Sequence, residues 1–323
     1  MKICLIGCGD HAHRVYLPSL RRCQQENGEL VLAACCDINK EQAEKTAQEA
    51  GFARAYTDFE EMLDAEKPDA ALIVTSYMVT AKIASAVMQR GVAALIEKPP
   101  GETIVQTEEL AAQVAAQPCL HQVAFNRRHI PAVRALKADI AARGAQVQHI
   151  DFAMYRVRRT DDNFYTTAVH GVDLVCNLAQ APCARAQFMY GDATRFGDNV
   201  RNFLMHFNFA NGVTAALTVC PVSGELSERV KLVTDAGTYR VETPLHGDGD
   251  DGSLTFTENR QTVPMPASDG ATIFESNGFY YQLHSFLQDV RAGKQPADTL
   301  AACLDSMRLS DCLRRLAATY EAE

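Results

Sequence analysis

Residues Lys2–Ala12, with the sequence KICLIGCGDHA, decide the fold. The run begins with mostly apolar residues typical of a buried strand, and the glycine pattern G-x-G-x-x-A follows them directly. Gly7 permits a tight turn, Gly9 lets a pyrophosphate approach the backbone, and small Ala12 lets the next helix pack on the sheet. Amide groups at the start of that helix bind phosphate oxygens. The residues predicted to contact a dinucleotide in this loop are Gly7, Gly9, Asp10, His11 and Ala12.

A second apolar strand is predicted over residues 29–36, and it ends at Asp37. The dinucleotide-binding pattern places a carboxylate near this position, where it accepts a hydrogen bond from the adenosine ribose 2′-hydroxyl. The same charge repels a 2′-phosphate, so Asp37 favours NAD over NADP. Lys40 is close enough in sequence to weaken that repulsion, which leaves NADP possible. Asp37 also precedes a predicted helix and is a candidate for its N-cap.

Strands and helices alternate through the first 125 residues. Further strands are predicted over residues 70–75, 92–96 and 119–125, and helices over 40–50, 58–63, 80–90 and from Thr103 onward. Such alternation is typical of a parallel, doubly wound sheet. Ligands bind at the carboxyl ends of the strands in such sheets. Thr75, at one of these ends, is therefore a predicted cofactor contact.

The stretch Val92–Pro100 joins a buried strand to the sequence Glu97-Lys98-Pro99-Pro100. Prolines lack the amide hydrogen that a sheet needs, so the strand must end here. The ammonium of Lys98 would then lie in the crevice above the sheet. Burial lowers the pKa of a lysine and a nearby carboxylate such as Glu97 raises it, so Lys98 is a candidate proton-transfer group. A solvated lysine in a turn is the alternative.

Composition and charge exclude several classes of protein. The 323 residues are 47% hydrophobic and carry a net charge of −9 at pH 7, which indicates a folded globular protein and excludes a nucleic-acid binder with a basic face. No run approaches the roughly 18 apolar residues that span a bilayer, so we expect no membrane association, and no signal peptide is predicted. The 11 cysteines include no pair with the C-x-x-C spacing of a zinc site, and we expect no metal. Such cysteines are most simply buried hydrophobes in a reducing compartment, which predicts the cytoplasm.

Four features together resemble the Gfo/Idh/MocA family. They are the glycine pattern, the acid after the second strand, Pro68-Asp69-Ala70 before a strand, and Glu97-Lys98-Pro99. Members of this family are nicotinamide-dependent dehydrogenases that act mostly on sugars, inositols and their derivatives. The resemblance covers nearly the whole chain and is closest in its first part. It implies an NAD-dependent oxidoreductase in which Lys98 is the catalytic lysine and touches both the cofactor and the reacting hydroxyl of a sugar or polyol.

The resemblance implies two further features around Lys98. Glu97 is expected near the cofactor, and the Lys98–Pro99 peptide bond is expected to be cis, as it often is in relatives, although cis bonds are a minority of X-Pro bonds. The segment Phe125–Pro131 is similar to the family's crossover segment, in which an arginine at the position of Arg128 is usual. Arg127 and Arg128 would each hold either a polar substrate or a structural carboxylate.

A strand predicted over residues 147–157 carries Tyr155 near its end. The loop after this strand faces the substrate in relatives, so Tyr155 is a candidate substrate contact. A cluster of arginines follows it, at Arg156, Arg158 and Arg159. The cluster is either a site for an acidic or phosphorylated sugar or a solvated charged face.

A helix predicted across residues 166–175 places Thr166, His170 and Asp173 on one face. His170 and Asp173 match the family's histidine and the acid three residues after it, while Thr166 stands where the family has another aspartate. In relatives that aspartate and the histidine act beside the lysine on the hydroxyl that loses its proton. Histidine can serve as a general base without the acid, so all three residues are candidate substrate contacts and His170 is a candidate catalytic residue.

The rest of the chain predicts a large, mostly antiparallel sheet. Alternating strands run through residues 183–265, and Asn211-Gly212 is typical of a hairpin turn. Helices over 133–142 and 169–179 would cover one face. The open face would then be buried by a partner subunit, giving a homodimer or homotetramer.

The predicted organisation is a dinucleotide-binding Rossmann domain over residues 1–122 and an α+β substrate-binding and oligomerisation domain over 123–323. Loops are expected over 244–252 and 264–276. Closing helices are predicted over 279–292 and 297–318 and would pack back on the first domain. The fold class is thus α/β, with a doubly wound parallel sheet followed by an open antiparallel one.

Two alternatives to a dehydrogenase stay open. Some relatives are glycosidases that oxidise and re-reduce the sugar within one turnover, although the motif that marks them is not evident in this sequence. A catalytically silent regulator that binds NAD or a sugar is the other alternative, and Thr166 is the residue that supports it. The presence of Lys98 and His170 favours the enzyme.

Overall fold

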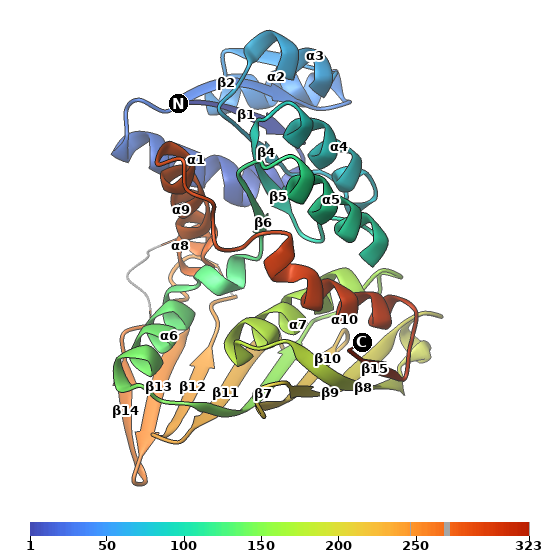
Figure 1. Ribbon diagram of the computed structural model, residues 1–323, viewed down its shortest axis with the longest axis vertical. Coiled ribbons are helices and arrows are strands. Elements are labelled where there is room, and N and C mark those ends of the chain that lie inside the picture. Colours follow the sequence, from blue (N-terminus) through green and yellow to red (C-terminus); the bar gives the residue numbers. More distant parts are fainter. Residues whose placement is uncertain (246, 268–271, 323) are drawn as a thin grey trace. The chain divides into compact units, whose positions relative to one another are not determined.

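A computed structural model describes residues 1–245, 247–267 and 272–322. The chain forms two compact units, each built on its own sheet (Figure 1). The first unit comprises Met1–Phe125 and Phe279–Leu304, and the second comprises Asn126–Gly278 and the residues from Asp305 onward. The chain therefore crosses from the first unit to the second, returns once, and crosses again.

The first unit is a six-stranded parallel sheet. In spatial order its strands are β3 (Arg54–Tyr56), β2 (Val31–Cys36), β1 (Lys2–Ile6), β4 (Ala70–Ile73), β5 (Ala93–Glu97) and β6 (His121–Ala124). Every neighbouring pair is parallel. The strand order reverses between β1 and β4, and such sheets bind ligands at the carboxyl ends of the strands at this point. The predicted doubly wound Rossmann sheet is confirmed.

Helices cover both faces of this sheet in the way that its buried strands require. They are the π-helix η1 (Ala12–Tyr16), α1 (Leu17–Glu26), α2 (Lys40–Ala50), α3 (Phe59–Glu66), α4 (Tyr77–Gln89), α5 (Ile104–Ala116), α9 (Phe279–Arg291) and the 3-10 helix η4 (Ala301–Cys303). The apolar runs of β1 and β4 are fully buried at Ile3, Leu5 and Leu72, as expected for parallel strands with helices on both sides. Helix α9 packs against α1, η1 and β5.

The second unit is a nine-stranded, mostly antiparallel sheet, as predicted. In spatial order its strands are β14 (Gln261–Met265), β13 (Ser253–Glu258), β12 (Thr238–Glu242), β11 (Ser227–Thr234), β7 (Val147–Tyr155), β10 (Thr214–Cys220), β9 (Arg201–Phe209), β8 (Cys183–Asp192) and β15 (Thr319–Glu321). Strands β7 and β10 are parallel to each other. The predicted Asn211-Gly212 turn joins β9 to β10, with Gly212 at φ +87°.

Helices pack on one face of the second sheet. The helical segments of this unit are the 3-10 helices η2 (Asn126–His129) and η3 (Thr194–Phe196), with α6 (Pro131–Arg143), α7 (Tyr165–Ala179), α8 (Ile273–Ser276) and α10 (Leu304–Arg314). Helix α6 packs against β12 and β13, and α7 packs against β7 and β10, which confirms the predicted cover. In the part of the chain that the structure describes, no helix is long and apolar enough to cross a membrane.

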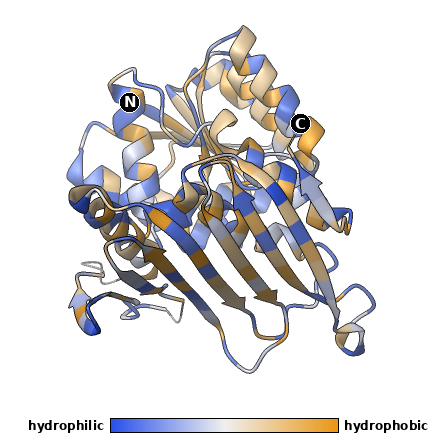
Figure 2. Ribbon diagram, turned by 60° about the horizontal axis from the view of Figure 1, so that its bottom comes forward, coloured by the Kyte–Doolittle hydropathy of each residue, from blue (hydrophilic) through white to orange (hydrophobic). Residues whose placement is uncertain are grey.

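In the described ranges, no helix lies in front of the other face of this sheet (Figure 2). Along β9, for example, Phe203, Met205 and Phe207 are buried toward the helices, while Leu204 and His206 point to the open side. The period of two places apolar and polar residues alternately on the two faces. The open face therefore mixes hydrophobic and hydrophilic side chains.

The predicted helix over residues 297–318 is wrong at both ends. Helix α10 ends at Arg314, Leu316 adopts a left-handed backbone with φ +52°, and the chain then adds β15 to the edge of β8. Strand β14 was not expected over its full length because it has no buried residue and so no alternating pattern. In the predicted loops, residues 246 and 268–271 lie outside the described residues, and α8 forms a short helix within the second loop.

Helix α7 packs on its sheet through Gly171. A Cβ atom at this glycine would lie 2.4 Å from Met154 Sδ and 3.0 Å from Leu217 Cδ1. Gly171→Val should therefore overpack the core and lower the free energy of unfolding by about 1–3 kcal/mol, measured by urea denaturation. Gly28→Val is the matched control, because nothing lies within 4 Å of a Cβ at exposed Gly28. An equal effect of both substitutions would contradict this interpretation of the packing.

Candidate functional site

The two glycines of the predicted dinucleotide loop have different surroundings. Gly7 has φ +95°, and a Cβ atom there would lie 2.1 Å from the carbonyl oxygen of Val74, so only glycine fits where β1 and β4 meet. No atom lies within 4 Å of a Cβ built on Gly9. The backbone at Gly9 is therefore open on that side. These residues fit the close approach of a pyrophosphate that the glycine pattern predicts.

A cleft of about 320 Å³ lies beside this loop. Four predicted cofactor contacts line it, and they come from the ends of three strands: Gly7, Gly9, Asp37 and Thr75. Exposed apolar side chains, Ile38 and Val79, line it as well. The structure thus brings these predicted residues together around a space with an acidic group and apolar walls, which suits a ribose and an aromatic base.

Asp37 orders the glycine loop. Its Oδ2 accepts a hydrogen bond from the amide of Cys8 at 2.9 Å, and its Oδ1 accepts one from the amide of Asn39 at 2.9 Å. Asp37 is not the N-cap of α2, because the side chain of Asn39 accepts from the amides of Glu41 and Gln42 and fills that role. The alternative that Asp37 caps this helix is therefore wrong.

The helix after the glycine loop begins with a π-turn. Ala12 is fully buried at its first position, as expected for a small residue against the sheet, while Asp10 is exposed. The α1 helix continues directly from Tyr16. Single π-turns within helices are frequent at functional sites. Here the turn places His11 and Tyr16 on the same buried carboxylate.

That carboxylate is Glu97, the last residue of β5. The Nε2 atom of His11 lies 3.0 Å from Glu97 Oε1, and the hydroxyl of Tyr16 donates to the same oxygen at 2.6 Å. The backbone amide of Lys98 donates to Oε2 at 2.9 Å. The ring of Phe279 packs edge-on against His11, with centroids 5.5 Å apart. His11 and Glu97 were predicted near the cofactor, but their pairing and the contact of Tyr16 were not predicted.

The network keeps Glu97 charged although it is buried. Burial raises the pKa of this carboxyl, but the charges and hydrogen bonds of His11, Lys98 and Tyr16 outweigh burial and hold the pKa below its usual range. Burial and the charge of Glu97 raise the pKa of Tyr16 well above its usual value, so the phenol remains a hydrogen-bond donor. Three donors of the first unit thus converge on one negative charge.

Lys98 follows this charge directly. Its side chain is half-buried at the carboxyl end of β5, between β4 and β6 in the sheet. The Lys98–Pro99 peptide bond is cis, which confirms the prediction. The residue therefore occupies the strand end at which ligands bind in such sheets.

The predicted residues of the second unit divide into two groups. Thr166 and His170 are half-buried on α7, whereas Asp173 on the same helix is fully buried. Arg128 Nε donates to Asp173 Oδ2 at 2.8 Å, its Nη2 donates to Oδ1, and Ser306 Oγ donates to Oδ1 at 3.0 Å. This geometry favours the structural role of Arg128 over a substrate contact, and it gives Asp173 the same role.

Tyr155 lies on the opposite face of the sheet from α7. Along β7 the buried residues are Ile150, Phe152 and Met154, and Met154 packs against Gly171 of α7. Tyr155 points the other way, where the guanidinium of Arg229 lies 5.9 Å from its ring centroid. The structure therefore does not bring the side chain of Tyr155 together with His170.

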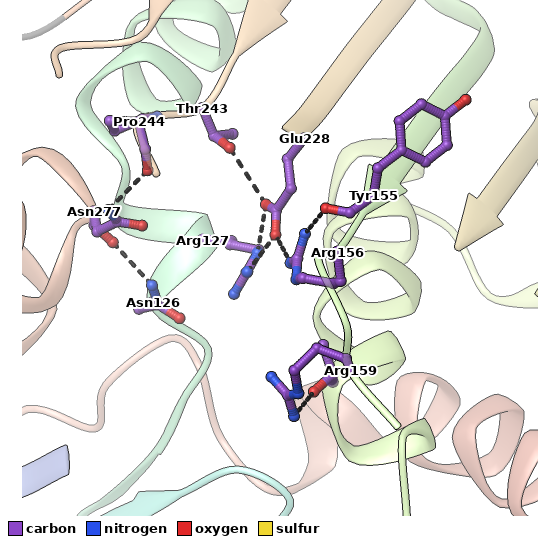
Figure 3. Close-up of polar contacts among 10 residues, drawn as sticks. Asn126, Arg127, Tyr155, Arg156, Arg159, Glu228, Thr243, Pro244 and Asn277 are labelled. Atoms are coloured by element: carbon purple, nitrogen blue, oxygen red, sulfur yellow. Dashed lines mark hydrogen bonds and ion pairs between the residues drawn. The ribbon is translucent and has the colours of Figure 1, made fainter. Parts of the chain in front are cut away.

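The second unit contains a buried charge cluster in which Arg127 holds a structural carboxylate, one of its two predicted roles, but the acid itself, Glu228, was not predicted (Figure 3). Arg127 donates to both carboxylate oxygens of Glu228, with Nε 2.8 Å from Oε2, and Arg156 Nη2 donates to Oε1. Thr243 Oγ1 donates to Oε2 at 3.3 Å. The available signal was Glu228 itself, an acid at an inward position of alternating β11, beside buried Val230.

The three arginines after β7 do not form one face. Arg156 turns inward to Glu228, Arg159 pairs with Asp161 at 2.8 Å, and Arg158 is exposed with φ +52°. Both alternatives for this run therefore need revision. Neither a single receptor of three arginines nor a wholly solvated face describes it.

A protein-family model, GFO_IDH_MocA, matches residues 1–125 and is described as the oxidoreductase family with an NAD-binding Rossmann fold. Residues 1–125 form a Gfo/Idh/MocA NAD-binding domain. The match covers the glycine loop, Asp37 and Lys98, so the family resemblance stated from these residues is confirmed. NAD is accordingly the cofactor of this Gfo/Idh/MocA domain.

Similar proteins share the fold over nearly the whole chain. A curated relative, 4-carboxy-2-hydroxymuconate-6-semialdehyde dehydrogenase from Sphingobium sp. (strain NBRC 103272 / SYK-6), is 22% identical over 96% of both chains. A dehydrogenase structure from Chromobacterium violaceum has a TM-score of 0.85 at 20% identity, covering 98% of this chain and 95% of its own. UDP-N-acetylglucosamine 3-dehydrogenase from Acidithiobacillus ferrooxidans has a TM-score of 0.82 at 20% identity, covering 98% and 97%. These similarities show that the Gfo/Idh/MocA domain is followed here by the same second fold.

The charge of Asp37 should control the choice between NAD and NADP. Asp37→Asn keeps the size of the side chain but removes the charge that repels a 2′-phosphate, so the preference for NAD should fall roughly tenfold. The measurement is calorimetric binding of both nucleotides. Asn39→Ala is the control, since it removes the cap of α2 and leaves the carboxylate in place. An unchanged preference in Asp37→Asn would mean that the acid only orders the loop.

The buried Glu228 should make stability depend on pH. Burial raises its pKa, but Arg127 and Arg156 lower it from 4.5 to about 2. A lowered folded-state pKa contributes stability above the unfolded value, and this contribution is lost as pH falls from 4.5 to about 2. Glu228→Gln should cost about 3–5 kcal/mol at neutral pH.

Urea denaturation at a series of pH values checks this prediction. The stability difference between the natural protein and Glu228→Gln should shrink across the stated window, because the natural side chain also becomes neutral there. Glu258→Gln, at an exposed position of β13, should show no such trend. A difference that stays constant with pH would contradict the assignment.

Proposed function

We propose that this protein is an NAD-dependent dehydrogenase that transfers a hydride between the nicotinamide and a hydroxyl or carbonyl carbon of a sugar, inositol or sugar derivative. The observation that carries the proposal is a half-buried lysine, Lys98, at a strand end of an NAD-binding domain, with a buried charged carboxylate beside it. The similar proteins are named as dehydrogenases, and one acts on UDP-N-acetylglucosamine.

The cofactor supplies the hydride acceptor when it is bound. In the oxidation, the substrate hydroxyl gives its proton to Lys98 or His170 while the hydrogen on the same carbon leaves as hydride, so that a carbonyl forms. In the reduction, the same groups return the proton. The proposal requires Lys98 of the first unit and His170 of the second to meet the same oxygen. Thr166, one turn before His170 on α7, is a further proposed substrate contact.

The alternatives rest on Thr166. Without a carboxylate at this position, the chain could bind NAD and a sugar as a regulator, or could return the hydride within one turnover as glycosidase-like relatives do. His170 and Lys98 support the dehydrogenase, because a binding protein needs neither group for proton transfer.

Two further expectations belong to the proposal. The open face of the second sheet is the proposed surface for association into a homodimer or homotetramer (Figure 2). All 11 cysteines are free, and nine of them are buried, which supports a reducing compartment such as the cytoplasm.

Replacing Lys98 tests the proposed chemistry. Lys98→Met keeps a side chain of similar length but removes the amino group that would take and return the proton. Turnover should therefore fall roughly 10²- to 10⁴-fold. NAD affinity should change little by comparison. The measurement is the absorbance of reduced nicotinamide with a panel of sugars and polyols, alongside calorimetric NAD binding. Lys82→Met, at an exposed position of α4, is the control and should match the natural protein.

The same assay separates the alternatives. Release of an aglycone from a glycoside without net reduced nicotinamide would favour the glycosidase-like reaction. Tight NAD binding with no turnover across the panel would favour the regulator. Turnover that survives in Lys98→Met would remove the lysine from the mechanism.

A further inference from the structure

The cluster around Glu228 contains more positive than negative charge. Two guanidinium groups, those of Arg127 and Arg156, share the one carboxylate of Glu228 (Figure 3). All three side chains are nearly buried, with exposed fractions of 10%, 8% and 1%. Among the described residues, no second carboxylate pairs with Arg127 or Arg156.

The neighbouring ion pairs do not supply the missing negative charge. Arg159 already pairs with Asp161, and Arg128 already pairs with Asp173. Each of these pairs is neutral. Burial lowers the pKa of Arg156. The charge of Glu228 raises this pKa, and the nearby charge of Arg127 lowers it further. One positive charge of the cluster therefore stays without a counter-charge from the described part of the chain.

Two guanidinium nitrogen atoms of the cluster are available to a ligand. Arg127 uses Nε and Nη2 on Glu228, and Arg156 uses Nη1 on the carbonyl of Tyr155 and Nη2 on Glu228. Arg127 Nη1 and Arg156 Nε bond to no other described residue. Neither atom is among the fully buried polar atoms without a partner, so both reach the surface.

A nearly buried charge without a counter-ion is costly, and proteins retain such charges where a ligand neutralises them. We propose that Arg127 and Arg156 form a subsite for a carboxylate group of the substrate. Resting on the proposed function, this inference narrows the substrate class to acidic polyols and sugars, such as aldonic and uronic acids. Charge-assisted hydrogen bonds from a guanidinium to a carboxylate are stronger than hydrogen bonds between neutral groups.

The charge count favours a carboxylate over a phosphate. One excess positive charge is neutralised by a singly charged carboxylate, whereas a phosphate dianion would leave an excess of negative charge. The position also fits a substrate. Segment η2, which carries Arg127, contacts α7, and Arg159 donates to Thr167 of α7 at 3.1 Å. The subsite therefore borders the helix that carries Thr166 and His170.

Binding of a matched pair of probes tests the inference without turnover. D-gluconate and D-glucitol differ in a carboxylate, and both are measured by calorimetry with the natural protein loaded with NAD, at equal ionic strength. Gluconate should bind roughly 10- to 100-fold more tightly than glucitol, which is the gain in affinity expected from a charge-assisted hydrogen bond. Equal affinities for the two probes would overturn the inference.

Substitution of Arg127 locates the site. Arg127→Gln leaves Glu228 paired with Arg156, so no buried carboxylate loses all its partners. The preference for gluconate over glucitol should fall at least fivefold, which is about half of the expected effect on a logarithmic scale. Arg127→Lys keeps the charge and should retain part of the preference. Arg240→Gln, at an exposed position of β12, should leave it unchanged. A preference that survives in Arg127→Gln would place the anion elsewhere.

Turnover distinguishes this inference from the proposed function. Oxidation of neutral polyols with no preference for acids would overturn the subsite and leave the dehydrogenase standing. Binding of gluconate that depends on Arg127, with no reduction of NAD by any acid or neutral polyol, would keep the subsite and overturn the dehydrogenase. Acids that are oxidised with a KM lower than that of their neutral counterparts, by a ratio that Arg127→Gln reduces, would support both.

Discussion

The negative charge of Glu97 is the constraint on which the first unit depends. A carboxylate without solvent is stable only when donors surround it, and here the donors come from the start of the π-helix, its end, and the backbone of Lys98. The dinucleotide loop and the strand end that carries Lys98 are thereby fixed to each other. Because of this connection, a movement of the loop on binding a cofactor would be transmitted to the lysine.

Buried ion pairs also stabilise the second unit, and they are formed by the adjacent residues Arg127 and Arg128. Arg128 reaches Asp173 in the helix layer, while Arg127 reaches Glu228 in the sheet. The crossover segment η2 is therefore held by two ion pairs, one to helix α7 and the other to strand β11. Removing either acid would leave a buried guanidinium, which is far more costly than removing an exposed pair. Two buried ion pairs thus anchor this segment to the second unit.

Local patterns allowed the sequence to predict much of this structure. The glycine loop, the strand that ends at Lys98 and the hairpin at Asn211-Gly212 each depend on neighbouring residues, and their structures follow the prediction. The pairing of Glu97 with His11 could not be predicted, because the two lie 86 residues apart. Arg127 and Glu228 are 101 residues apart. The orientation of Tyr155 depended on which face α7 covers, and β14 gave no alternating pattern because it is exposed.

Strand β7 has a consequence for the order of folding. It lies between β10 and β11, both far along the chain, whereas β8 to β10 and β11 to β14 are each joined by local hairpins. Local hairpins close quickly, but pairing across long loops is slow because chain entropy opposes it. We therefore expect two separate meanders to form early and β7 to join them late. The first strand of this unit to leave the ribosome is then among the last to find its neighbours.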